Sequence, residues 1–372
     1  MTKARSNATA NAAKGDLTVG NGTNLSGVLG VGSNGDTIVA DSSTSTGLRY
    51  QVPKTQNAIY NSGFDIWQRG TTFTGINPFY GADRWCFARA GGATGGTWTR
   101  QSAGLTGFNY SVRAQRNSGN TGTQDFRVAA QSLETADSLR FAGKTVTFSF
   151  YLKVGANYSG GSNIYANVIS GTGTDQQHWI NGFTGEALVV SNFLTGVTTS
   201  WQRFSVTGTV ASNATEIAFS VGYTPSGTAG TNDWAEVTGL QLEEGSVATP
   251  YSRMSGTIQG ELAACQRYYW QYNGSTNVQY FSNAFGYNST SLYGVMKLPV
   301  TMRSNPSFSA VNPTAGLAWN ATTILTATNI TMTNADPNSP LVLFTFASGV
   351  SSNQSSMLGL GNTGVMQFSA EL

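Results

Sequence analysis

The chain has 372 residues, of which only 10% are charged, and its formal net charge is +2. It has neither a basic cluster that would suit nucleic-acid phosphates nor an apolar run of the ~20 residues that a membrane-spanning helix needs. We therefore expect no nucleic acid as a partner and no membrane insertion. Abundant Gly, Ser, Thr and Asn, with 19 Phe, 15 Tyr and 8 Trp to bury, favour an all-β fold.

Residues 1–56 are predicted to form a polar arm followed by a glycine-rich β segment. Within it, residues 15–19 recur in imperfect form at 35–39, and each copy places a Gly-Asp turn before a short strand. The segment has too few large apolar residues to bury a core of its own. Because identical chains wrapped around one axis would cover each other's strand edges, we expect an oligomer, most simply a homotrimer.

Residues 57–253 are predicted to form a β-sandwich, or jelly roll. Apolar residues alternate with polar ones there, which places one face of each strand in a core and the other toward water. The clearest runs are Phe108, Tyr110, Val112 and Ala114; Val146, Phe148, Phe150, Leu152 and Val154; Phe204, Val206 and Val210; and Ile217, Phe219 and Val221. Several such strands separated by turn residues indicate a sandwich. A short helical turn is expected at 133–141.

A linking helix is predicted at 254–271. From 256 to 271, one face of this helix carries Ile258, Leu262, Cys265 and Tyr269, and Ser255 is placed to cap its start. Residues 272–372 return to β patterning and are predicted to form a smaller C-terminal β-domain. Its prolines are expected at strand edges and turns.

Residue types that carry catalysis or hold metals are few and scattered. His178 is the only histidine, and neither Cys86 nor Cys265 lies near it in the sequence, so we predict no metal site of this kind and no catalytic triad. The two cysteines could form a disulfide, but buried free thiols are the interpretation we favour. Asp65 and Asp233 are candidates for a structural calcium ion, and no other cofactor is expected.

Glycoside hydrolysis is the nearest enzymatic alternative, and it needs two carboxylates that face each other across a groove. Glu243 and Glu244 are adjacent, so on a strand they would point to opposite faces. Asp233 and Glu236 could line one loop. Ordinary solvated or turn-forming acids explain these residues better, and we therefore expect the chain not to be an enzyme.

Aromatic rings are better candidates for a binding site, because sugars stack their C–H faces on Trp and Tyr. Trp98 and Trp179 are both flanked by polar residues, and His178 adjoins Trp179. These three residues are the predicted carbohydrate-binding set. The interpretation we favour for the two rings themselves is a place in the sandwich core or in a subunit contact, and for His178 a surface or structural role.

The segments that open and close the predicted sandwich resemble a module common in phage tail-fibre and other appendage proteins. They are NSGFDIWQRG at 61–70 with ADRW at 82–85, and VTGLQLEEG at 237–245 with ATPY at 248–251. The segment CQRYY at 265–269 resembles the one that follows this module, and PVTMR at 299–303 with SAEL at 369–372 resemble its usual C-terminal partner. Residues 15–42 resemble a glycine-rich leader of phage fibres.

This resemblance implies a jelly roll of the carbohydrate-binding kind. The tryptophans of the opening motifs are expected to anchor the core, with four charged residues pairing around them. These structural anchors are Trp67, Trp85, Asp65, Arg69, Asp83 and Arg84.

The expected function is that of a structural protein of a phage particle. As a trimeric tail-fibre subunit, the chain would attach to the virion through residues 1–56 and contact the host with its distal β-domains, by several weak sites acting together. Its expected partners are copies of itself, other virion proteins (of the tail, portal adaptor or capsid) and, as a weaker implication, a host surface glycan. The alternatives are a capsid decoration or head-fibre protein that stabilises the shell, and a polysaccharide depolymerase.

Overall fold

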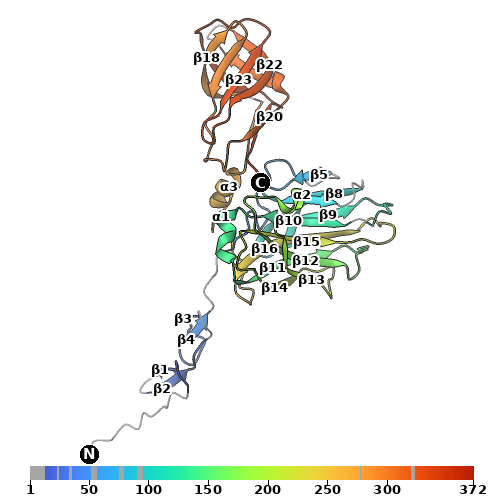
Figure 1. Ribbon diagram of the computed structural model, residues 1–372, viewed down its shortest axis with the longest axis vertical. Coiled ribbons are helices and arrows are strands. Elements are labelled where there is room, and N and C mark those ends of the chain that lie inside the picture. Colours follow the sequence, from blue (N-terminus) through green and yellow to red (C-terminus); the bar gives the residue numbers. More distant parts are fainter. Residues whose placement is uncertain are drawn as a thin grey trace, which may run out of the picture. The chain divides into compact units, whose positions relative to one another are not determined.

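The computed structural model describes residues 13–22, 25–32, 36–51, 57–74, 79–89, 95–123, 125–276, 278–319 and 323–372 (Figure 1). The chain divides into two compact units, Met1–Thr55 and Gln56–Leu372. Strands form nearly all of the regular structure, which confirms the all-β fold class. No helix in the described ranges is long and apolar enough to cross a membrane.

The first unit consists of two antiparallel hairpins. Its strands are β1 (Leu17–Gly22) paired with β2 (Leu25–Leu29), and β3 (Thr37–Ala40) paired with β4 (Leu48–Gln51). The strands predicted at 15–19 and 35–39 are thereby confirmed as β1 and β3. The apolar side chains of Leu17, Val31 and Ile38 are exposed, as expected for a segment with too few large side chains to enclose a core.

The second unit begins with a sandwich of two six-stranded sheets, in which the strand pairings between described residues are antiparallel. The first sheet has the order β13 (Ala187–Phe193), β12 (Ile164–Gly171), β15 (Glu216–Tyr223), β10 (Phe126–Ser132), β7 (Cys86–Arg89), β6 (Phe79–Tyr80). The second has the order β14 (Gln202–Thr209), β11 (Thr145–Val154), β16 (Trp234–Glu244), β9 (Phe108–Arg116), β8 (Gly96–Leu105), β5 (Thr72–Thr74).

The sandwich core lies between these two sheets and follows the predicted alternation. From β11 it takes the side chains of residues 146, 148, 150, 152 and 154, and from β15 those of Ile217, Phe219 and Val221. In β9 the alternation is only partly realised, because Val112 and Ala114 enter the core while Phe108 stays partly exposed. Burial of this large apolar surface is the main force that holds the two sheets together.

The linking helix is shorter than predicted. Helix α3 spans Ile258–Gln266, and its cap is Thr257, whose hydroxyl accepts a hydrogen bond from the Gly260 backbone N–H at 3.1 Å. The predicted helix over 254–271 is therefore wrong at both ends. Tyr269 belongs to a strand, because the aromatic segment after the helix pairs with the C-terminal strand. The turn expected at 133–141 is confirmed as α1 (Thr135–Ser138) and the 3-10 helix η2 (Leu139–Phe141).

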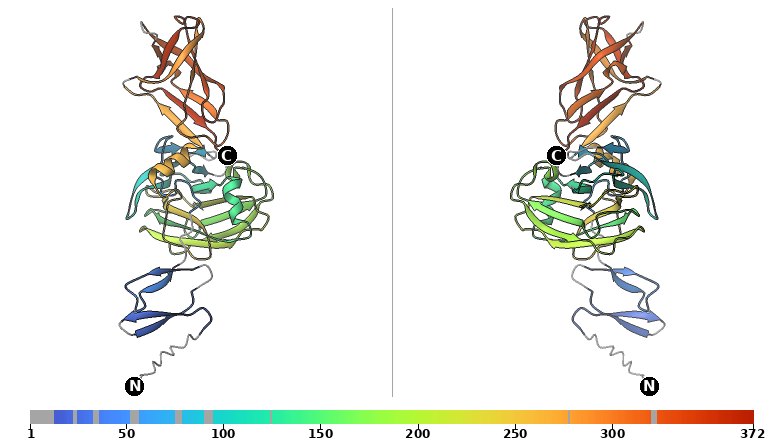
Figure 2. Two further views of the ribbon diagram at one scale, coloured as in Figure 1. Left: turned by 90° about the vertical axis from the view of Figure 1, so that its left-hand side faces the viewer. Right: turned by 90° about the vertical axis from the view of Figure 1, so that its right-hand side faces the viewer.

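The C-terminal β-domain combines a small sheet with a closed barrel (Figure 2). The small sheet has the order β17 (Tyr269–Asn273), β25 (Val365–Ser369), β20 (Ser307–Val311). The barrel has the order β18 (Gln279–Asn288), β19 (Ser291–Val295), β23 (Leu341–Phe346), β22 (Ile324–Asn334), β21 (Gly316–Trp319), β24 (Ser355–Leu360). One apolar core, which includes Leu292, Phe344 and Phe368, serves both sheets.

Buried ion pairs join the sandwich to the end of the chain. The Arg84 Nη1 lies 2.5 Å from the Glu371 Oε2, and the Arg69 Nη2 lies 3.0 Å from the Glu371 Oε1. The guanidinium of Arg84 also lies over the ring of Tyr268, at 3.6 Å from its centroid, and that of Arg69 lies 3.4 Å from the Tyr269 centroid. Arg69 and Arg84 of the opening motifs therefore bind the C-terminal residue Glu371, in addition to the contacts these motifs make within the sandwich.

The remaining predicted anchors take separate partners. The Trp85 ring is fully buried and donates from Nε1 to the Asn61 carbonyl, whereas Trp67 is only partly buried. Asp83 lies 3.7 Å from Arg69, and burial raises the pKa of its carboxyl. Asp65 pairs with Arg253 at 2.8 Å, so the four charged anchors do not form one cluster around the tryptophans.

Candidate functional site: the outer face of the first sandwich sheet

One of the three predicted sugar-binding residues is placed where it cannot bind. Trp98 has 0% exposure in the sandwich core, and its Nε1 donates a hydrogen bond to the Arg127 carbonyl at 2.9 Å. The ring stacks on Phe87 and Phe126. The prediction of Trp98 as a glycan platform is wrong, because its polar flanking residues point away from the core while the ring points into it.

Trp179 and His178 lie on the outer face of the first sheet. They belong to the four-residue helix α2 (His178–Asn181). Trp179 and Phe183, which follows the helix, pack on the outward side chains of Cys86, Ala130, Ile169 and Ala218. The Trp179 ring is 6% exposed, and its Nε1 has no hydrogen-bond partner among the described residues. Burial lowers the pKa of His178, although its Nε2 lies 3.0 Å from Glu186.

Beside this covered area, the same face carries a row of aromatic side chains. Phe193 on β13 is 66% exposed and meets the Tyr165 ring edge-on at a centroid distance of 6.5 Å. The Tyr165 ring extends across Gly222 of β15, where even a Cβ atom would lie 2.4 Å from its hydroxyl oxygen. Glycine at 222 therefore allows the tyrosine to reach the neighbouring strand, where its hydroxyl donates to the Asp125 Oδ2.

Arg127 on β10 occupies the middle of this face. It is opposite Gly222 in the strand pairing, and its guanidinium carbon lies 4.8 Å from the centroid of the Trp179 ring. Its Nε is buried and has no hydrogen-bond acceptor among the described residues. No carboxylate in that part of the chain lies within the 4.0 Å of an ion pair with it. Among the described residues, the guanidinium therefore has neither an ion-pair partner nor an acceptor for its Nε.

The next row of outward side chains is polar and small. The Ser191 hydroxyl on β13 donates to the Asn167 side-chain oxygen on β12 at 2.7 Å. On β15, Ser220 is fully buried, and its hydroxyl has no partner in the described ranges. Leaving a buried hydroxyl unpaired costs ~1–3 kcal/mol.

Together these residues bring aromatic rings and polar groups onto one face of the sandwich. We call Asp125, Arg127, Tyr165, Asn167, Trp179 and Ser220 the Arg127 surface. It combines aromatic rings with donors and acceptors from three adjacent strands and one short helix. Burial raises the pKa of the Asp125 carboxyl, which accepts hydrogen bonds from Tyr165 and, at 3.3 Å, from Thr224.

Sequence reasoning missed most of this surface. Tyr165, Asn167 and Arg127 lie at outward positions of strands β12 and β10, and no local motif marks them. One signal was present: Arg127 is the only charged residue in the otherwise apolar and polar-neutral strand Phe126–Ser132. A lone charge in a strand of this kind requires either a partner or a ligand.

The acids considered for catalysis lie in a strand or next to one and have partners within the sandwich. Glu236 lies within strand β16 rather than in a loop, and it pairs with Arg113 at 2.8 Å and with Lys153 at 3.3 Å. Glu243 is buried and Glu244 exposed, so the two point to opposite faces as predicted.

The two carboxylates suggested for calcium likewise have arginine partners. Asp233 forms a fully buried pair with Arg116 at 2.8 Å, and Asp65 pairs with Arg253. Each carboxylate already neutralises a guanidinium, which leaves it a poor calcium ligand. The described residues contain no group of three or more His, Cys, Asp and Glu side chains that could hold a metal ion.

Both cysteines are buried free thiols, which confirms the interpretation favoured from the sequence. Burial raises the pKa of the Cys86 thiol to about 12 and raises that of Cys265 well above its ordinary value. Neither thiol is therefore available as a nucleophile or metal ligand near neutral pH.

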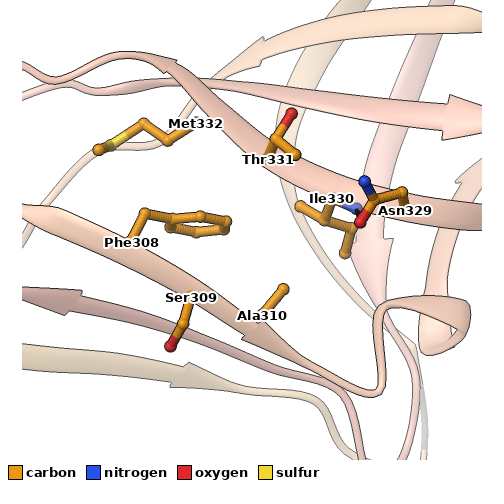
Figure 3. A pocket seen from close by; sticks show the side chains of 7 residues that line it. All are labelled: Phe308, Ser309, Ala310, Asn329, Ile330, Thr331 and Met332. Carbon is orange, nitrogen blue, oxygen red and sulfur yellow. Dashed lines mark hydrogen bonds between the residues drawn. The ribbon is translucent and has the colours of Figure 1, made fainter.

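A shallow hollow of about 460 Å³ lies in the C-terminal domain, between β20 and β22 (Figure 3). Phe308 and Ala310 point from β20 toward Ile330 and Met332, while the Ser309 hydroxyl points away and donates to Gln367. Asn329 and Thr331 complete the lining, which contains no ionisable side chain. The hollow therefore lacks the groups that acid–base chemistry needs.

No protein-family model matches the sequence, and the comparison with curated proteins gives no match either. Among solved structures, the chain is similar to the CBM22-1 xylan-binding domain of Paenibacillus barcinonensis Xyn10C, at 13% identity and a TM-score of 0.31 over 52% of this chain and 97% of that one. It is similar to TmCBM61 in complex with β-1,4-galactotriose, at 14% identity and a TM-score of 0.30 over 51% of this chain and 100% of that one.

The chain is also similar to the enzymatically active domain of tailspike protein 4 of bacteriophage CBA120. The identity is 13% and the TM-score 0.32, over 50% of this chain and 21% of that one. The chain thus spans about a fifth of the tailspike domain.

Proposed function

We propose that this chain is a non-enzymatic glycan-binding protein and that the Arg127 surface is its binding site. The observation that carries the proposal is the group of unused polar atoms on one face of the sandwich. The Arg127 Nε, the Trp179 Nε1 and the Ser220 hydroxyl lack hydrogen-bond partners among the described residues. They lie next to an aromatic row that ends in the exposed ring of Phe193.

The physical reason is that sugars need both features at once. A pyranose ring stacks an apolar C–H face on an aromatic side chain, and its hydroxyls satisfy donors and acceptors around that ring. A buried donor without an acceptor raises the free energy of the unbound protein. A ligand that accepts a hydrogen bond from this donor removes that cost, and its affinity increases accordingly. Water alone satisfies such atoms only where it can reach them.

We further propose that the protein is a subunit of a phage particle, as a tail fibre that presents the sandwich to the host surface. The support is the resemblance of the segments 61–70, 82–85 and 237–251 to phage appendage modules, together with the two hairpins of the first unit. Those hairpins leave Leu17, Val31 and Ile38 exposed, and identical chains in a homotrimer would cover them. Several sandwiches in one trimer would add their weak affinities.

Two other functions remain as alternatives. A capsid decoration or head-fibre protein would share the oligomeric N-terminal segment but would not need glycan binding. A polysaccharide depolymerase would need a pair of facing acids, and the acids named above pair with arginine or lysine or, for Glu243, accept a hydrogen bond from the Thr249 hydroxyl. Gold-labelled antibody against the chain, applied to intact particles, separates tail from capsid.

The binding test uses the purified chain on a glycan array. Phe193→Ala is the informative variant, because this exposed ring adjoins Tyr165 of the Arg127 surface and its removal leaves the sandwich core intact. The matched control is Tyr287→Ala, which removes a ring of similar exposure, 62%, from the C-terminal barrel. We expect Phe193→Ala to reduce the array signal at least about threefold and Tyr287→Ala to leave it unchanged. Equal signals from both variants and the parent chain would contradict the proposed site.

A further inference from the structure

Arg127 differs from the buried arginines of the sandwich. The fully buried Arg84 and Arg116 each face a carboxylate, Glu371 at 2.5 Å and Asp233 at 2.8 Å. Arg127 shares their low accessibility at Nε but has no carboxylate within ion-pair distance in the part of the chain that the structure describes. Arg127 is only partly buried, but withdrawing part of a guanidinium from water without an anion still costs free energy, which a bound anion would offset.

Arg100 on β8 provides a useful contrast. Like Arg127, it lies over an aromatic ring, with its guanidinium carbon 4.5 Å from the Tyr110 centroid. Its donors are not among the buried atoms without a partner, so they reach solvent. Arg127 differs from it in one atom: its Nε is buried without an acceptor among the described residues, while its Nη1 and Nη2 are not among the buried atoms and reach solvent.

The nearby acids do not take the role of a partner. Asp125 accepts the hydroxyls of Tyr165 and Thr224. Glu186 lies against His178 at the edge of the same face. Glu216, at the start of β15, accepts the backbone N–H of Gln176. These carboxylates interact with other donors. The N–H groups at the end of the Arg127 guanidinium therefore remain available on the outer face of the sheet.

We propose that Arg127 binds the acidic substituent of a glycan, a carboxylate or a sulfate ester, so that the protein selects acidic over neutral polysaccharides. This inference rests on the proposed glycan-binding function and names the class of sugar. Two parallel N–H donors of a guanidinium match two oxygens of such a group, and the contact is charge-assisted. The Trp179 ring under the guanidinium fixes its plane before the ligand arrives, which lowers the entropy cost of binding.

The test is an array of matched acidic and neutral glycans. It includes polygalacturonate with its methyl ester, alginate and hyaluronan with their carboxyl-reduced forms, and sulfated galactan with its desulfated form. Comparing the carboxylated glycans with the sulfated one shows which acidic group is bound. Comparing each acidic glycan with its neutral form separates the effect of the charge from that of the sugar. The variants are Arg127→Met and Arg127→Lys, with Arg100→Met as the matched control from the opposite sheet. Unfolding temperature is measured for each variant. We expect Arg127→Met to unfold within ~2 °C of the parent chain, because the Arg127 guanidinium makes no hydrogen bond or ion pair with the described residues, and the backbone hydrogen bond from Trp98 is kept.

We expect the chain to bind at least one acidic member at least about tenfold more tightly than its neutral partner. Losing a charged hydrogen-bonded contact predicts a decrease in affinity of about 10- to 100-fold for Arg127→Met. Arg127→Lys keeps the positive charge but loses the two parallel N–H donors, so we expect an intermediate affinity. Arg100→Met should bind as the parent chain does.

Two results would overturn the inference in distinguishable ways. Equal binding of neutral and acidic partners, with Phe193→Ala still harmful, would leave the glycan site in place and remove its acidic preference. Binding to no member of the array would remove the proposed function and the inference together.

Discussion

The contact between Glu371 and two arginines of the opening motif should contribute a large part of the stability of the second unit. Glu371→Gln keeps the size of the side chain and removes its charge. The fully buried Arg84 guanidinium would then retain its hydrogen bond to the Ser132 carbonyl at 2.8 Å but lose its anion. Arg69 would lose its 3.0 Å contact at the same time. Removing one partner of a buried ion pair costs about 3–5 kcal/mol, since the remaining charge is left without compensation.

Differential scanning calorimetry measures this loss directly. For a domain of this size, each kcal/mol lowers the unfolding temperature by roughly 2 °C, so a decrease of about 6–10 °C is expected. Glu244→Gln is the matched control, because Glu244 pairs with Lys144 at 3.4 Å and both side chains are 52% exposed. An exposed pair contributes only ~0–1 kcal/mol. If Glu371→Gln and the control shift the unfolding temperature equally, the reasoning about the buried junction is wrong.

Two further predictions concern titratable groups. Cys86 and Cys265 should not react with a thiol reagent at pH 8 in the folded protein, because burial raises the pKa of both thiols. Both should react once guanidinium chloride unfolds the chain. Rapid labelling of the native chain would contradict their burial. Affinity for an acidic glycan should rise as the pH is lowered from neutral. Burial raises the pKa of Asp125, so its negative charge, which repels an acidic ligand, is lost at a higher pH than that of an ordinary aspartate. Asp125→Asn should flatten the pH profile measured by calorimetric titration, and an unchanged slope in that variant would refute the role of Asp125.

The alternation of apolar and polar residues predicted the sandwich well, because a strand with one face in a core must repeat with a period of two. Residues 146–154 follow this rule throughout β11. The same rule gave no information about Trp98, since polar neighbours flank a buried residue on a strand as readily as an exposed one. The pattern shows that successive side chains alternate, and only the assembled sheets decide which face is inside.

The end of the linking helix was missed for a related reason. Local periodicity extended it to Tyr269, but residues 269–273 pair with 365–369, almost a hundred positions later in the chain. The binding surface shows the same limit. Arg127, Tyr165 and Ser220 come from three strands that are adjacent only after the sheet order β12–β15–β10 is known. Neither contact could be predicted from neighbouring residues.

The structure of the chain with a bound acidic oligosaccharide tests the central claim most directly. The account predicts a sugar ring against Tyr165 and Phe193, with its acidic group within about 3 Å of the Arg127 guanidinium. A ligand found on the other sheet of the sandwich or on the C-terminal barrel, with Arg127 left without a contact, would contradict it.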